Sequence, residues 1–308
     1  MTQQPGTRYV VVGGGAVGRL LVDLLLVAPA QVSVVDRGPR PPWLPEACCF
    51  HRGDITAIGT DLLGVLRCAD VVLLAVPEQA ALAAVRDVAA ALPAGALLVD
   101  TLSVKTRIVP ALRATGSRLE LLSINPMFAP SLGLAGRPVA VVGVREGLRS
   151  RELLARVEHQ GGRLARLTEQ EHDRVTAAVQ ALTHVAVLAF GLALAELDVD
   201  MAAVAAVATP PHLLLLGLLA RISCGPPHAY RDIQVGPNAA AARDALGAAA
   251  ARLDRVVQAG DPAEFEDVLG GLRRLLGADL EHYGDLCRHS IAALDTTTPR
   301  PPSERSLP

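Results

Sequence analysis

A glycine-rich turn near the N-terminus constrains the fold of this chain more than any other feature. Gly13, Gly15 and Gly18 form a GxGxxG pattern directly after an apolar run that begins at Arg8 and directly before an apolar stretch at residues 20–26. In a strand–turn–helix unit of this kind, the first glycine allows a tight turn, the second lets the backbone approach a diphosphate, and the third permits close packing of the helix. The pattern therefore predicts the first βαβ unit of a dinucleotide-binding domain.

The acidic residue expected in such a unit is also present. Asp36 ends the next apolar run, 18 residues after Gly18, where a carboxylate can accept hydrogen bonds from ribose hydroxyls. The carboxylate would repel a 2′-phosphate, so NAD is favoured over NADP, although Arg37 and Arg40 follow closely and are either solvated or able to hold a phosphate. The predicted cofactor-binding residues are Gly13, Gly15, Ala16, Val17, Gly18, Asp36, Arg37 and Val76.

Further short apolar runs, separated by helical patterns, follow the first unit. Buried parallel strands have this texture, and the runs occupy residues 71–76, 96–100, 119–124, 139–144 and 163–167. The predicted fold class of residues 1–166 is therefore α/β, a Rossmann-type doubly wound parallel sheet.

The second half of the chain shows only long Ala/Leu-rich helical patterns. Thr168 and Glu171 form a capping box at its start, and the prolines of 210–211 and 225–227 are predicted to interrupt the helices. Residues 167–295 are predicted to be an all-helical domain and residues 296–308, rich in threonine and proline, a disordered tail. The apolar helices exceed what one small bundle needs to bury, so we expect a homodimer.

Composition restricts the partners. The chain has 308 residues, 51% of them hydrophobic, and a formal net charge of −2, which favours a small-molecule partner over nucleic acid or an anionic membrane. The longest uncharged apolar stretch, residues 181–195, falls short of the roughly 20 residues that cross a bilayer and is expected to be a buried core helix. The five cysteines lack paired spacing and no signal-peptide pattern is seen, so a cytoplasmic protein with reduced thiols is expected. The histidine spacing indicates no metal site.

Three further motifs carry a family resemblance. They are Asp100-Thr101-Leu102-Ser103-Val104-Lys105, Ser123-Ile124-Asn125-Pro126-Met127-Phe128 and Gln180-Ala181-Leu182-Thr183-His184. Together with the glycine turn they resemble the prephenate dehydrogenase family over about residues 8 to 290. The resemblance implies an NAD-dependent oxidative decarboxylation of a cyclohexadienyl substrate, with the helical half serving as substrate and dimerisation domain.

The resemblance also implies roles for individual side chains. Ser103 would bond the substituent at substrate carbon C4 or the side chain of residue 125, although its hydroxyl could equally cap a helix from Val104 onward. His184 would lie on a substrate-binding helix, where a lone histidine would otherwise be interpreted as a core residue. Arg221 would grip a substrate carboxylate through its bidentate guanidinium, the alternative being a surface arginine.

Two charged features are less specific. Lys105, the only lysine in the chain, faces either a substrate carboxylate or a neighbouring acid. The Glu171-His172-Asp173 run also resembles the family but is interpreted as a charge cluster at the start of a helix.

Asn125 departs from the family pattern. Family members ordinarily carry histidine before Pro-Met-Phe, where it accepts a hydrogen bond from the substrate's 4-hydroxyl as hydride leaves. A positioned base contributes about 10² to 10⁴ in rate, and an asparagine cannot take a proton, although its carbonyl can accept a hydrogen bond. A 4-amino substituent expels hydride without a simultaneous proton transfer, so 4-amino-4-deoxyprephenate is favoured as substrate, as in one branch of the family. Asn125, Ser103 and His184 are the predicted catalytic residues.

Other functions stay open. Prephenate or arogenate is the alternative substrate, and a catalytically weak protein that senses NAD or prephenate-like ligands is a second alternative. Hydroxyacid dehydrogenases and imine reductases share this architecture, but the hydroxyacid enzymes need a lysine on an interior helix and the helical half contains none.

Overall fold

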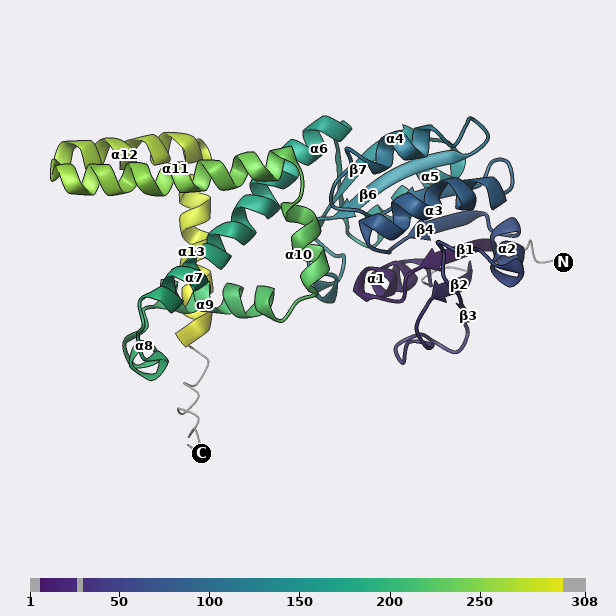
Figure 1. The fold of residues 1–308 in the computed structure, drawn as a ribbon, viewed down its shortest axis with the longest axis horizontal. Coiled ribbons are helices and arrows are strands. Elements are labelled where there is room, and N and C mark those ends of the chain that lie inside the picture. Colours follow the sequence, from purple (N-terminus) through teal and green to yellow (C-terminus); the bar gives the residue numbers. More distant parts are fainter. Residues whose placement is uncertain (1–5, 27–29, 296–308) are drawn as a thin grey trace. The chain divides into compact units, whose positions relative to one another are not determined.

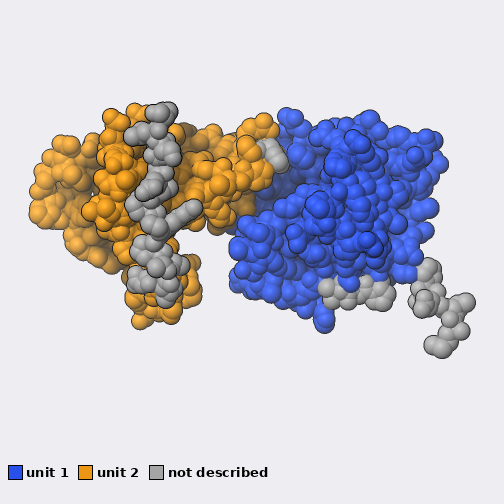
Figure 2. Space-filling view, turned by 90° about the horizontal axis from the view of Figure 1, so that it is seen from below, with its two compact units in different colours: residues 1–176 blue, residues 177–308 orange. Residues whose placement is uncertain are grey.

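The computed structural model describes residues 6–26 and 30–295 and divides into two compact units, residues 1–176 and 177–308 (Figure 2). The division falls ten residues beyond the predicted boundary at 166, because helix α6 (Glu169–Thr176) packs against strand β7 (Pro138–Arg145) of the first unit and buries His172 and Asp173 there. The predicted disordered tail, residues 296–308, lies outside the described residues.

The first unit is built on an eight-stranded sheet with the strand order β3-β2-β1-β4-β5-β6-β7-β8 (Figure 1). All neighbouring strands are parallel except β6 and β7, which are antiparallel. The other strands are β1 (Thr7–Val12), β2 (Ala30–Asp36), β3 (Cys49–Arg52), β4 (Val71–Leu74), β5 (Leu97–Asp100), β6 (Glu120–Pro126) and β8 (Arg163–Arg166). The predicted Rossmann-type sheet is confirmed. Strand β3 was missed because its sequence, Cys-Phe-His-Arg, is no apolar run.

Helices cover both faces of this sheet. Side chains alternate along β1, so that Val11 joins a core with α1 (Ala16–Leu25) and α5 (Leu148–His159) while Val10 and Val12 join a second core. The second core contains the apolar sides of α2 (Thr60–Arg67), α3 (Glu78–Ala91) and α4 (Ile108–Arg113). Strand order reverses between β1 and β4, and open α/β sheets bind ligands beyond the strand ends at such a reversal.

The second unit contains helices and no strand among its described residues. A π-helical turn (Ala177–Leu182) leads into α7 (Thr183–Glu196), and the chain continues through α8 (Met201–Val207), α9 (Pro210–Ser223), α10 (Pro227–Gln234), α11 (Pro237–Ala259), α12 (Pro262–Leu276) and α13 (Leu280–Asp295). The predicted interruptions are confirmed, since α9 and α10 each begin on a proline. Proline is tolerated there because the first helical N–H needs no partner within the helix.

The apolar surface of this unit corrects one expectation. The helical run Glu169–Glu196 is 28 residues long and contains an 18-residue window with a mean hydropathy of 1.9, enough by length and composition to cross a membrane, yet only 11% of that window is buried. The predicted buried core helix is therefore wrong for the single chain, in which Leu192 is 70% exposed. Exposed apolar area on this scale marks an interaction surface.

Candidate active site

The glycine turn, residues 13–18, has the geometry that a dinucleotide requires. Gly13 has φ +112° and a side chain there would collide with the carbonyl oxygen of Ala75, 2.2 Å away. A Cβ on Gly18 would lie 1.8 Å from the oxygen of Gly13, whereas one on Gly15 would meet nothing within 4 Å. The turn is thus closed on its protein side and open at Gly15, the N-cap of α1, where helix N–H groups can meet a diphosphate.

The acidic residue is held against this turn. Asp36 accepts hydrogen bonds from the backbone N–H groups of Gly14 at 2.6 Å and Gly38 at 2.7 Å, which orients its carboxylate at the end of β2. Its remaining lone pairs can serve ribose hydroxyls. Trp43, which was not among the residues predicted from the sequence, also contacts this turn. Its indole N–H donates to the carbonyl of Gly14 at 3.2 Å.

The two neighbouring arginines differ in availability. Arg40 donates to the carbonyl oxygens of Leu44, Pro45 and Cys48, so its guanidinium is committed to the loop that follows. The Arg37 side chain is 76% exposed, at 3.9 Å from Asp54. Val76, beyond the end of β4, lies beside Gly13. The residues of this strand end therefore fit a dinucleotide whose ribose carries no 2′-phosphate.

A second group of polar residues gathers at the ends of β5 and β6. Asp100 is the last residue of β5, Ser103 follows three residues later and Asn125 is the last but one of β6. Because these strands are parallel and adjacent, both end at the same sheet edge. Ser103 is half-buried and forms no hydrogen bond within the described part of the chain, and it caps no helix, since α4 begins at Ile108.

Lys105 lies entirely inside this group. Its Nζ is 3.0 Å from Asp100 Oδ1 and donates to the carbonyl of Ile124 at 2.8 Å, and both charged side chains are 0% exposed. Complete burial lowers the pKa of the Lys105 ammonium, and the adjacent Asp100 carboxylate opposes that effect. Of the two partners predicted for Lys105, the structure shows the neighbouring acid, Asp100, and not an exposed ammonium that could reach a substrate carboxylate. By bonding Ile124, Lys105 holds the end of β6 just before Asn125.

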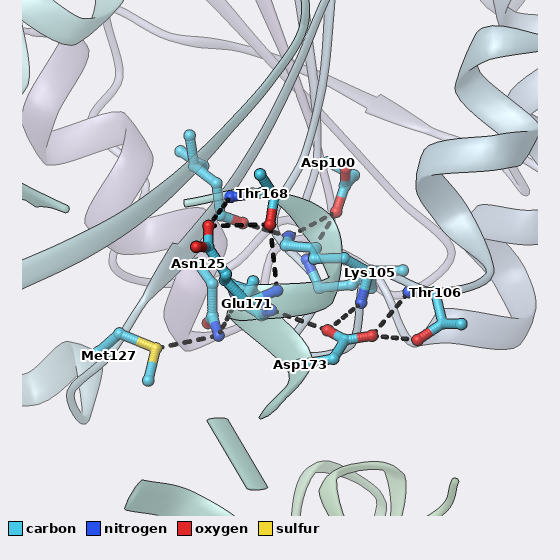
Figure 3. Close-up of polar contacts among 11 residues, drawn as sticks. Asp100, Lys105, Thr106, Asn125, Met127, Thr168, Glu171 and Asp173 are labelled. Carbon is cyan, nitrogen blue, oxygen red and sulfur yellow. Dashed lines mark hydrogen bonds and ion pairs between the residues drawn. The ribbon is translucent and has the colours of Figure 1, made fainter. Parts of the chain in front are cut away.

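Asp173 connects this strand end to α6 (Figure 3), and its neighbour His172 contacts Asn125. Asp173 accepts from the backbone N–H groups of Lys105 at 2.7 Å and Thr106 at 2.8 Å and from the Thr106 hydroxyl. His172 Nδ1 is 2.8 Å from Asp173 Oδ1, and its Nε2 is 3.2 Å from Asn125 Nδ2. We call Asp100, Lys105, Thr106, Asn125, Met127, His172 and Asp173 the Asn125 cluster.

Charge states within the cluster follow from its surroundings. Burial lowers the pKa of the His172 imidazole and outweighs the hydrogen bond to Asp173, which favours the charged form. Burial alone would raise the pKa of Asp173, but hydrogen bonds from His172, Thr106 and two backbone N–H groups hold it below its usual value. The pair is thus a neutral imidazole beside an ionised carboxylate.

Sequence reasoning missed His172 and Asp173 by interpreting them as a charge cluster at a helix start. The predicted capping box is confirmed, since Thr168 and Glu171 exchange hydrogen bonds of 2.9 Å and 3.2 Å. However, the two following side chains are 0% and 6% exposed. The match of this run with the family was the available signal, because local charge pattern alone does not distinguish a solvated first turn from a buried one.

His184 and Arg221 both belong to the helical unit. His184 lies on α7 and Arg221 on α9, which pack against each other. Burial lowers the pKa of the His184 imidazole and the positive charge of Arg221 lowers it further. The His184 ring meets Tyr230 edge-on with centroids 5.0 Å apart, and its buried Nδ1 has no partner among the described residues. Arg221 is exposed in the single chain.

The fold and these residues define a dinucleotide-dependent dehydrogenase with an appended helical domain. Among residues 6–26 and 30–295, no group of three or more His, Cys, Asp or Glu side chains is placed to hold a metal ion. Comparison with known proteins agrees with this class. Residues 51–137 match the family model of the prephenate dehydrogenase nucleotide-binding domain, and residues 168–271 match that of its dimerisation domain.

The chain belongs to the prephenate dehydrogenase family, whose members are NAD-dependent oxidoreductases, as predicted. It is 45% identical to a 4-amino-4-deoxyprephenate dehydrogenase of Streptomyces pristinaespiralis over 289 residues, 93% of this chain and 97% of that relative. Two solved structures share the fold at 18% identity. One is prephenate dehydrogenase of Aquifex aeolicus in complex with hydroxyphenyl propionate and NAD⁺ (TM-score 0.69, covering 89% of this chain and 99% of that one), the other Synechocystis arogenate dehydrogenase (TM-score 0.64, covering 90% and 100%).

Proposed function

We propose that this protein oxidises 4-amino-4-deoxyprephenate with NAD and releases carbon dioxide to give 4-aminophenylpyruvate. The observation that carries the proposal is Asn125, a buried amide where the family ordinarily has a histidine. The similarity to the Streptomyces pristinaespiralis relative, which is named for this substrate, supports it. Prephenate and arogenate, whose C4 substituent is a hydroxyl, are the competing substrates.

The chemistry of the C4 substituent explains the preference. NAD, when bound, accepts the hydride that leaves C4. The amine lone pair forms a double bond to C4 as that hydride departs, and the resulting iminium takes up the electron pair released when the ring carboxylate leaves as carbon dioxide. The ring becomes aromatic and the amine ends neutral, so no proton has to leave during hydride transfer. Asn125 needs only to accept a hydrogen bond from the amine, which an amide oxygen does.

A hydroxyl at C4 makes a greater demand on the site. Its oxygen supports the developing positive charge less well than nitrogen, so removal of its proton by a positioned base contributes about 10² to 10⁴ in rate. Asn125 has no basic atom to take that proton. The free amine is the reactive form, and oxidation of the amino substrate should therefore accelerate as pH rises through the pKa of its ammonium form.

The remaining site residues have proposed roles. Ser103, whose hydroxyl is uncommitted within the described chain, bonds the C4 substituent or Asn125. On the helical unit we assign Arg221 to a substrate carboxylate and His184 to a polar group of the same ligand, because a bidentate guanidinium suits a carboxylate and the buried Nδ1 of His184 lacks a partner in the described unit. Gly13, Gly15, Ala16, Val17, Gly18, Asp36 and Val76 bind NAD, with Arg37 at the edge of that site.

The assembly and location are proposed on similar grounds. The match to a dimerisation domain and the exposed apolar side chains of α7 support a homodimer formed by the helical unit. Such a dimer would cover the apolar side chains of α7, and this is the reason we place the protein in the cytoplasm rather than across a membrane.

The proposal is tested by NADH formation with 4-amino-4-deoxyprephenate, prephenate and arogenate under identical conditions. We expect the amino substrate to have the highest kcat/KM. Turnover of prephenate or arogenate at an equal or higher kcat/KM would assign the protein to aromatic amino acid synthesis instead. Binding of NAD and ligand without turnover of any of the three would identify a sensor.

A further inference from the structure

Both hydrogen atoms of the Asn125 amide group are already committed within the protein. Nδ2 lies 3.2 Å from His172 Nε2 and 3.1 Å from the sulfur of Met127. An amide NH2 has two donors and no more. No described residue donates a hydrogen bond to the oxygen of this amide, Oδ1. Oδ1 is also not one of the described polar atoms that are buried without a hydrogen-bond partner.

The orientation of this amide follows from its neighbours. The Asp173 carboxylate can only accept hydrogen bonds, so at 2.8 Å the proton between it and His172 belongs to Nδ1. In a neutral imidazole Nε2 then carries a lone pair and accepts from Asn125. The Met127 thioether is likewise an acceptor without a proton. Reversal of the amide would set Oδ1 against two acceptors, so the arrangement with Nδ2 inward is the only one in which each contact has a donor.

Asp173 itself is fixed from the other side. It accepts from two successive backbone N–H groups, those of Lys105 and Thr106, as well as from the Thr106 hydroxyl. These bonds join the segment after β5 to α6, and they leave the carboxylate no freedom to turn away from His172. A chain of hydrogen bonds, each with a fixed donor and acceptor, therefore links the backbone through Asp173 and His172 to Asn125.

We propose that His172, held by Asp173 in its Nδ1–H tautomer, is a positioning residue that together with Met127 turns Asn125 Oδ1 outward as the acceptor for the substrate's C4 substituent. The inference rests on the proposed function, because it concerns how the same site selects its substrate. The C4 substituent must donate a hydrogen bond. It cannot pass its proton directly to His172, whose acceptor nitrogen is occupied by Asn125. The tautomer thus makes the site a proton-free acceptor, which an amine tolerates better than a hydroxyl.

A double-mutant cycle tests the inference through kcat and KM for 4-amino-4-deoxyprephenate. His172→Leu should lower kcat/KM about fivefold or more in the wild-type background, the weight of one ordinary hydrogen bond, by freeing the amide to reverse. In the Asn125→Ala background the same change should cost less than about twofold, because no amide remains to be oriented. His172→Gln, whose Oε1 can accept from Asn125, should restore most of the activity. Equal losses in both backgrounds would overturn the inference and leave His172 a structural residue.

Two further measurements make the outcome independent of folding defects and of the substrate. Met127→Leu removes the second acceptor with little change in volume and should lower kcat/KM with the melting temperature unchanged. Long-range ¹⁵N NMR of the histidine-labelled full chain should report the Nδ1–H tautomer for the resonance that His172→Gln removes. An Nε2–H tautomer would refute the inference even if the enzyme is active. Lack of turnover by the wild type with the Nδ1–H tautomer present would instead refute the proposed function.

Discussion

The two strand-end sites of the first unit are built from different materials. The glycine turn is formed by the backbone alone. It presents N–H groups, adopts a positive φ at Gly13 and leaves open space beside Gly15. The Asn125 cluster consists of mostly buried side chains that bond one another and come from β5, β6, α6 and the segments directly after the two strands. The glycine turn leaves its N–H groups open to a ligand's phosphates, whereas the cluster pairs most of its polar atoms internally and leaves the Asn125 amide oxygen and the buried Asp100 Oδ2 without a partner among the described residues. A substitution at the open edge of the glycine turn should therefore change ligand binding without changing stability, whereas one at a buried charged residue of the cluster should change stability.

The largest effect is expected from Lys105→Met. It leaves the buried Asp100 side chain without its partner, a change that costs about 3–5 kcal/mol and should lower the melting temperature by roughly 6–20 °C. Calorimetry of the apoprotein measures this. As a matched control, Asp100→Asn combined with Lys105→Met should recover much of the loss, because the amide oxygen can keep the bond from the N–H of Leu102. Unaltered melting of the single variant would mean that Lys105 is not paired as described.

Arg221→Ala tests whether side chains of the helical unit bind the substrate. Loss of a charged partner from a bound carboxylate is worth about 2–5 kcal/mol, so KM for the substrate should rise by roughly two orders of magnitude. His184→Ala should be milder, since a neutral imidazole supplies one hydrogen bond of about 1 kcal/mol. Initial rates at saturating NAD distinguish the two. If KM is unchanged in Arg221→Ala, this arginine is an ordinary surface residue.

The same difference explains what the sequence could reveal. The glycine turn and Asp36 lie within 24 residues, and their spacing is typical of a dinucleotide-binding unit. The cofactor and the type of sheet could therefore be predicted from the sequence. The Asn125 cluster joins positions 68 residues apart, Lys105 and Asp173. No local pattern indicates whether the first turn of a helix is solvated or buried, so His172, Asp173 and the burial of Lys105 required the fold. The apolar face of α7 was misjudged for a related reason, because composition does not say whether the covering surface belongs to the same chain.

Gly15→Ala sharpens the contrast on the cofactor side. Gly15 has an extended backbone (φ −76°, ψ −168°) and open space around its Cβ position, so alanine fits the free protein and the melting temperature should stay within about 1–2 °C. The added methyl fills the space that a diphosphate needs, and NAD affinity should fall roughly tenfold or more. Gly18→Ala is the control, in which the collision with Gly13 should lower stability as well. Unchanged NAD affinity in Gly15→Ala, measured by titration calorimetry, would place the diphosphate elsewhere.

Discrimination between cofactors is a smaller effect at the same site. Asp36 should make NAD bind at least about tenfold tighter than NADP, through charge-assisted bonds to ribose and repulsion of a 2′-phosphate. Asp36→Ser should narrow that gap. Arg40→Ala should leave NADP affinity as it is, because the Arg40 guanidinium is committed to loop carbonyls. Equal affinities of the wild type for both cofactors would contradict the assigned role of Asp36.

The central claim, that Asn125 makes the substrate site an acceptor that takes no proton, is tested most directly by kcat/KM for prephenate and its 4-amino analogue in wild type and Asn125→His. We predict that the wild type prefers the amino substrate. The histidine should raise activity on prephenate by about tenfold or more, without a parallel rise on the amine, and add an acid limb near its reference pKa of about 6.5 to the prephenate profile. A wild type that turns over prephenate at least as well, with a substrate ratio unchanged by the substitution, would contradict the account.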